Sequence, residues 1–107
     1  MKELVGQVNK LVIEEGTRSM IKNPLFNSRH EGYAVMLEEV DESVEEVEEV
    51  QNQMKHMWKN IKSDFGMASL ERNAQIIKNH AILLAAESIQ VAAMAQKFID
   101  SFKVENE

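Results

Sequence analysis

The feature that most constrains the fold is a run of apolar residues spaced alternately four and three positions apart between residues 33 and 65. These positions hold Tyr33, Leu37, Val40, Val44, Val47, Met54, Trp58, Ile61 and Phe65, with Gln51 as the one interruption. This spacing places the side chains on one face of an α-helix, as a heptad-like stripe that packs against another helix. The chain contains no Asn-Gly or Asp-Gly pair, the dipeptides typical of β-hairpins. The sequence therefore predicts an all-α protein.

Two helix starts and ends can be placed in the first half of the chain. An amphipathic segment predicts a short N-terminal helix over residues 1–22, which must stop before Pro24 because proline cannot continue a helix. Ser28 followed three positions later by Glu31 matches a capping box, the arrangement of side chains that begins many helices. We therefore predict a long helix over residues 28–62.

A turn around Gly66 separates this helix from a second long one, predicted over residues 69–103 with Ser69 as its N-cap. Its predicted core stripe is Ile76, His80, Leu83, Glu87, Val91, Met94, Phe98 and Phe102. Two consecutive long helices joined by a short turn form an antiparallel hairpin. The length suits one domain, so we expect residues 1–107 to be a single all-α domain.

The last predicted helix carries more apolar surface than one seam requires. Its non-polar arc is extended by Ile77, Ala81, Leu84, Ser88, Ala92 and Ala95. A helix with so wide an apolar face packs on two sides, so we expect the hairpins of two copies to form a four-helix bundle in a homodimer or higher homo-oligomer. In the alternative, the helix over residues 1–22 folds back and covers this surface in a monomer. Tyr33 and Trp58 lie on the long stripe, and we expect them in the core.

Composition excludes several functional classes. A net charge of -6 argues against a nucleic-acid-binding or membrane-surface protein, since both need a basic face. The absence of cysteine excludes disulfides and thiolate zinc sites and fits a cytoplasmic protein. No window approaches the roughly 20 apolar residues that a membrane span needs, so we expect no membrane association. Glycine-rich phosphate loops, serine nucleophile elbows and zinc-binding histidine spacings are also missing.

A dense acidic stretch lies in the first long helix. Eight of the twelve residues from 38 to 49 are Asp or Glu and none is basic. Like charges four positions apart, such as Glu38 and Glu42, destabilise a helix. A divalent cation, a basic partner or hydration alone would each compensate for this repulsion.

One carboxylate, Glu87, occupies an apolar stripe position, where burial is unfavourable unless the group is paired, protonated or bound to a metal. In an antiparallel hairpin that turns near residue 65, Glu39 and Glu42 lie level with Gln90 and Glu87. The three-residue spacing within each pair places both members on one helix face. Oxygen ligands that converge between two helices suit Mg²⁺, or alternatively Mn²⁺.

Two blocks of the sequence, HEGYAVMLEEVDE at residues 30–42 and AAESIQVAAMAQKFI at residues 85–99, resemble the MazG-like all-α nucleoside triphosphate pyrophosphohydrolases, especially small phage-associated members. That family carries an E-x-x-E motif on one helix and an E-x-x-D motif on the next. Glu39 and Glu42 match the first motif, and Glu87 matches the start of the second.

The sequence departs from the family pattern at three places. Gln90 stands where the second motif ends in aspartate, and Ser43 stands where leucine is usual. The segment from 51 to 78 is longer than the short linker expected between the motifs. A neutral amide in place of a carboxylate coordinates only through its oxygen, which favours the alternative of a non-catalytic helical oligomer with a structural or adaptor role.

The resemblance implies hydrolysis of a nucleoside triphosphate to the monophosphate and pyrophosphate. It implies Mg²⁺ held by Glu39, Glu42 and Glu87, with Gln90 as a neutral ligand. Catalytic roles are expected for Glu39 and for Glu38, the latter as a further ligand or a base that orients water. Phosphate contacts are possible for Lys97, Lys78 and His80; otherwise the lysines should be solvated and the histidine should be a hydrogen-bonded core residue.

Overall fold

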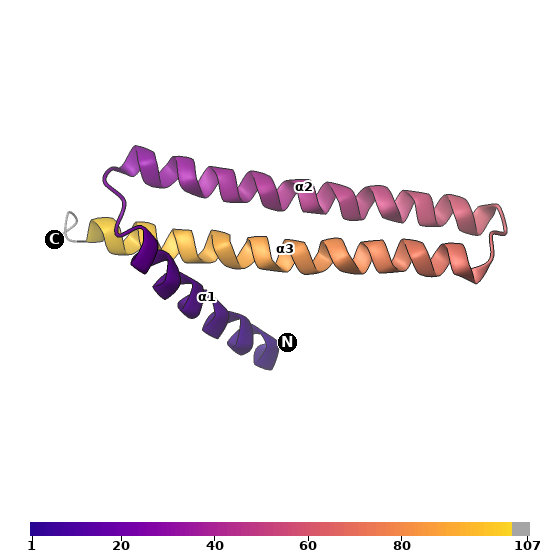
Figure 1. The fold of residues 1–107 in the computed structure, drawn as a ribbon, viewed down its shortest axis with the longest axis horizontal. Coiled ribbons are helices and arrows are strands. Elements are labelled where there is room, and N and C mark those ends of the chain that lie inside the picture. The colour runs from indigo at the N-terminus through magenta and orange to yellow at the C-terminus, as the bar shows by residue number, and fades with distance from the viewer. Residues whose placement is uncertain (104–107) are drawn as a thin grey trace. The chain divides into compact units, whose positions relative to one another are not determined.

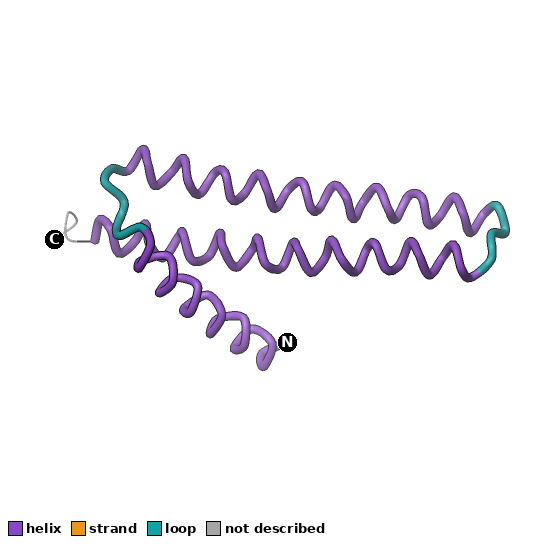
Figure 2. Tube along the Cα trace, in the orientation of Figure 1, coloured by secondary structure: helices purple, strands orange, loops and turns teal. Residues whose placement is uncertain are grey.

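The computed structural model describes residues 1–103 of the chain, and Figure 1 shows the three helices that they form. These are α1 (Lys2–Lys22), α2 (Arg29–Lys62) and α3 (Met67–Phe102). No strand occurs in this part of the chain (Figure 2), so the predicted all-α class is confirmed. The residues group into two compact units, one made of residues 1–40 and 87–103 and the other of residues 41–86.

The ends of α1 and the start of α2 follow the predicted signals. At the C-terminus of α1, the Asn23 backbone N–H donates to the Ser19 carbonyl at 2.8 Å, and Asn23 itself is extended ahead of Pro24. At the start of α2, the Glu31 backbone N–H donates to the Ser28 hydroxyl at 3.1 Å. Ser28 is therefore the N-cap of α2, as predicted.

The end of α2 is stabilised by a residue that the sequence did not single out. Asp64 adopts the left-handed conformation, with φ of 57°. Its N–H donates to the Ile61 carbonyl at 3.1 Å, and the Phe65 N–H donates to the Asn60 carbonyl at 3.0 Å. These two bonds form a Schellman motif, which satisfies the last carbonyls of the helix.

The predicted start of α3 is corrected by two residues. The Gly66 carbonyl accepts hydrogen bonds from the N–H groups of Ser69 and Leu70, so α3 begins at Met67. Ser69 thus lies inside the first turn and is not the N-cap. Gly66 has no positive φ, because Asp64 already reverses the chain.

The apolar core of the described residues lies in the first unit. Its buried members are Phe26, Ala93, Met94 and Phe102, and Val12, Val35, Met36 and Phe98 pack against them. Phe98 and Phe102 stack edge to face with their centroids 5.0 Å apart. Gly32 allows α2 to approach this cluster, since a Cβ there would lie 2.6 Å from Phe98 Cδ2 and 3.0 Å from Phe26 Cδ2.

The second unit has a different interior. Asn73 of α3 is its one buried residue. Asn73 Oδ1 accepts a bond of 2.8 Å from Asn60, and its amide nitrogen donates to Gln53 at 3.5 Å. The α2 face that contains these partners is half-buried and mixed in character: Ser43, Glu46, Val50, Gln53, Met57 and Asn60. Polar contacts therefore form much of the interface between the two helices.

The predicted apolar stripe of α2 does not lie at this interface. Its members in the second unit, Val44, Val47, Met54, Trp58 and Ile61, are all exposed. Each stripe residue comes one position after a residue of the half-buried face. The two faces are therefore related by a rotation of about 100° around the helix. The expectation that Trp58 and Tyr33 belong to the core is also wrong, since both side chains are more than half exposed.

The apolar character of α3 was underestimated as well. An 18-residue window of this helix has a mean hydropathy of 1.3, and by length and composition α3 is able to cross a membrane. The expectation that no segment reaches this threshold is therefore wrong. Length and composition alone do not distinguish a membrane span from the core helix of a bundle.

Candidate metal centre and adjoining cavity

Carboxylates from α2 and α3 meet at the candidate site. Glu39 and Glu87 are both half-buried in the first unit. Glu42 lies one turn beyond Glu39 on the uninterrupted helix α2, on the same face. Glu39, Glu42 and Glu87 each offer a carboxylate oxygen within 4.8 Å of the others. Glu38 is exposed and is not a member of this group.

The chemistry of this donor set fits a hard divalent cation. Three carboxylate groups at such short separation offer several oxygen ligands to one ion. A cation shared by these oxygens would offset the repulsion among their negative charges. Mg²⁺ and Mn²⁺ both prefer oxygen ligands of this kind.

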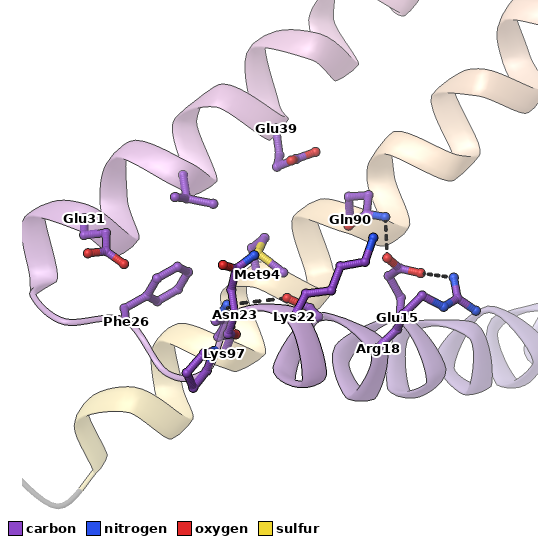
Figure 3. A pocket seen from close by; sticks show the side chains of 13 residues that line it. Glu15, Arg18, Lys22, Asn23, Phe26, Glu31, Glu39, Gln90, Met94 and Lys97 are labelled. Atoms are coloured by element: carbon purple, nitrogen blue, oxygen red, sulfur yellow. Dashed lines mark hydrogen bonds and ion pairs between the residues drawn. The ribbon is translucent and has the colours of Figure 1, made fainter.

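Gln90, one helical turn after Glu87, is held by a residue of α1. Its amide nitrogen donates to Glu15 at 2.8 Å, and the other Glu15 oxygen accepts a bond of 2.7 Å from Arg18 (Figure 3). The Glu15 carboxylate thus receives two donors. Because its nitrogen is turned to Glu15, the amide of Gln90 keeps its oxygen for another partner.

Sequence reasoning missed Glu15 as a neighbour of the site. Glu15 and Gln90 are separated by 75 positions, and the amphipathic pattern of α1 predicts only which face of the helix is buried. Nothing in that pattern specifies where along α3 the helix docks. The one available hint in the sequence was that Glu15 is an acidic residue near the boundary of the apolar face of α1.

A cavity of about 550 Å³ lies in the first unit beside these residues. Glu39 and Gln90 form part of its wall, together with Glu15, Arg18, Ser19, Lys22, Asn23, Pro24, Phe26, Glu31, Val35, Met94 and Lys97. Figure 3 shows that α1, α2 and α3 all contribute side chains to it. The volume falls in the range of small-molecule sites. The wall of the cavity contains both acidic and basic side chains, so one ligand could contact both kinds.

Lys97 is buried at this cavity, which corrects the expectation that it is solvated. Its ammonium donates to the Asn23 carbonyl at 2.8 Å and to the Ser19 hydroxyl at 3.4 Å, and lies 4.8 Å from the centre of the Phe26 ring. The carbonyl end of a helix carries partial negative charge, which favours a cation there. Lys97 therefore fastens the C-terminus of α1 to α3.

His80 lies in the second unit and has a different partner. Its Nδ1 is 2.7 Å from Glu46 Oε2, and both side chains are half-buried. The expectation of a hydrogen-bonded histidine is confirmed. Lys78 is exposed, as expected.

In comparisons with known proteins, no family model, no curated protein and no solved structure matches the chain.

Proposed function

We propose that the chain is a cytoplasmic, phage-type MazG-like enzyme that hydrolyses a nucleoside triphosphate to the monophosphate and pyrophosphate with Mg²⁺ or Mn²⁺. The observation that carries the proposal is the approach of the half-buried Glu39 and Glu87 carboxylates from two different helices, with Glu42 on the adjacent turn. The E-x-x-E resemblance assigns a reaction to this arrangement. The neighbouring cavity is large enough for part of a nucleotide.

In this proposal the three carboxylates hold the cation and Gln90 adds a neutral oxygen. When bound, the cation neutralises charge on the phosphates and activates water. Glu38 is exposed next to Glu39 and accepts the proton of the attacking water. Lys97 remains a candidate phosphate contact because its ammonium lines the cavity and has a third donor beyond those that bond to Asn23 and Ser19. His80 is assigned no role in binding, since it is not part of the cavity wall and Glu46 engages it.

The proposal is tested by incubating the purified protein with each ribonucleoside and deoxyribonucleoside triphosphate in Mg²⁺ or Mn²⁺ and measuring released pyrophosphate. Glu87→Gln and Glu42→Gln should abolish turnover, because each removes one ligand charge. Glu45→Gln is the matched control, since Glu45 is an exposed acidic residue on the same helix. A folded wild-type protein without turnover on any of these nucleotides would exclude the enzyme.

The second candidate is a non-catalytic helical oligomer that acts as a structural or adaptor protein. The amide at Gln90 favours it, because the site has one charge fewer than the E-x-x-D motif provides. The two candidates differ in one measurement. The non-catalytic protein binds the cation without releasing pyrophosphate, whereas the enzyme does both.

A further inference from the structure

The apolar stripe that α2 exposes in the second unit follows one face of the helix and is interrupted by Gln51. We name it the exposed seam and define it by Val44, Val47, Gln51, Met54, Trp58 and Ile61. The exposed fraction of its apolar side chains ranges from 38% at Val47 to 58% at Trp58. Because Asn73 is the one buried residue of this unit, the hairpin buries little apolar surface by itself. An exposed apolar surface of this length on a helix is typical of an interface.

Charged residues border the exposed seam at intervals of seven. Asp41 and Glu48 lie along its first half, and Lys55 and Lys62 lie along its second half. In heptad terms all four occupy position e, next to the seam, and all four are exposed. The opposite border, position g, consists of Ser43, Val50 and Met57, which are half-buried. The border that remains accessible is therefore acidic at one end and basic at the other.

We propose that the exposed seam binds the same seam of a second copy of this chain, with the two α2 helices antiparallel. In this arrangement Val44 packs near the partner's Ile61, Val47 near the partner's Trp58 and Gln51 near the partner's Met54. The two-fold axis then passes between positions 52 and 53. The inference concerns assembly and is independent of the proposed activity, because no ligand of the candidate metal centre belongs to the seam.

Charge complementarity selects the antiparallel direction. Positions e of two antiparallel helices face each other, so Glu48 lies near the partner's Lys55 and Asp41 near the partner's Lys62, and two-fold symmetry repeats each pair. In a parallel arrangement, position e faces position g, which carries no charge here. The acidic end of one border then lies at the same height as the acidic end of the partner's border, and the basic ends likewise lie at one height. The antiparallel dimer thus gains four opposite-charge pairs that the parallel dimer lacks.

The charges along this border disfavour two other binding partners for the exposed seam, a membrane surface and a helix of one charge sign. An anionic membrane surface repels Asp41 and Glu48, and a helix of one charge sign complements only half of the border. A reversed copy of α2 complements both halves. The second copy is therefore the occupant that the charges specify.

Cysteine cross-linking tests the direction, since the chain has no cysteine of its own. Val44→Cys and Ile61→Cys are prepared separately, mixed, and treated with a short thiol-specific cross-linker. The antiparallel dimer predicts a cross-linked heterodimer in the mixture and none in either variant alone, because identical positions are about 25 Å apart along the axis. Asn52→Cys mixed with Ile61→Cys is the control and should give no cross-linked heterodimer. Cross-linking of Val44→Cys with itself would indicate a parallel dimer and overturn the proposal.

Charge reversal tests the pairing. Glu48→Lys replaces two attractive contacts with two repulsive ones and should weaken dimerisation about tenfold in sedimentation analysis. Adding Lys55→Glu to the same chain should restore wild-type affinity, whereas Glu49→Lys, one residue away and off the border, should have little effect. A wild-type chain that sediments as a monomer at all concentrations, or whose seam binds only lipid vesicles, would overturn the proposal.

Discussion

Gln90 of α3 donates a hydrogen bond of 2.8 Å to Glu15 of α1, at the position where the MazG-like motif ends in aspartate. This contact makes the amide part of the packing between α1 and α3. An aspartate there would instead place a second carboxylate against Glu15, which already accepts from Arg18. In the proposed metal centre, the identity of residue 90 would therefore affect helix docking and metal affinity in opposite directions.

Gln90→Asp should lower the free energy of unfolding in EDTA by about 1.5 to 3 kcal/mol, because a hydrogen bond to a charged group becomes a repulsive contact. In Mg²⁺ the same variant should gain more stability than the wild type does, since the candidate centre acquires a charged ligand. Urea unfolding with and without Mg²⁺ measures both changes.

The exchanged pair is the control for this prediction. Glu15→Gln combined with Gln90→Asp restores one amide and one carboxylate in contact, so most of the stability lost in EDTA should return. A double variant no more stable than Gln90→Asp would show that the contact between the two side chains contributes little to docking.

Gly32 allows close packing at the start of α2. Gly32→Ala should destabilise the protein by about 1 to 3 kcal/mol, because the added Cβ overlaps the Phe98 ring at 2.6 Å and forces the core to shift. Gly16→Ala is the matched control: its Cβ meets nothing within 4 Å, and alanine raises helix propensity by up to about 1 kcal/mol. Thermal unfolding should therefore change in opposite directions, and equal shifts in both variants would contradict the packing argument.

Local sequence signals predicted the helices well, because each depends on residues close together in the chain. Ser28 caps α2 through Glu31, only three residues away, and Pro24 stops α1. The turn was placed correctly but attributed to Gly66, whereas Asp64 adopts the left-handed conformation. Asparagine and aspartate tolerate this conformation because their side chains form local hydrogen bonds. A glycine is therefore only the commonest signal for it.

Contacts between distant segments were predicted less well. The three-residue spacing and the antiparallel hairpin were sufficient to bring Glu39, Glu42 and Glu87 together. The periodicity of α2 did not specify which of two adjacent faces meets α3, since a one-residue rotation exchanges the apolar stripe for the face containing Gln53 and Asn60. The polar partners of Asn73 lie on the face that meets α3, and periodicity, which counts only apolar residues, does not detect them.

Lys97 should contribute to stability through its position at the end of α1. Lys97→Met keeps the length of the side chain but leaves the Asn23 carbonyl without its 2.8 Å donor, which should cost about 1 to 3 kcal/mol. Hydrogen exchange should increase throughout α1 more than in the second unit, because α1 loses an attachment to α3. Ser19→Ala removes only the longer 3.4 Å contact and should have a smaller effect. Unchanged exchange in α1 of Lys97→Met would contradict the fastening role.

The candidate centre predicts that substitution of one ligand removes the stabilising effect of Mg²⁺. The midpoint of thermal unfolding is compared in EDTA and in Mg²⁺ for each protein, so that contacts of Glu39 unrelated to the metal cancel. If the proposed centre binds Mg²⁺, the ion should stabilise the wild type by about 2.7 kcal/mol at one hundred times its dissociation constant, and Glu39→Gln should lose most of this gain. Glu38→Gln is the control, since the adjacent Glu38 is exposed and lies outside the carboxylate group. An equal Mg²⁺-induced increase in all three proteins would show that the carboxylates do not share a cation.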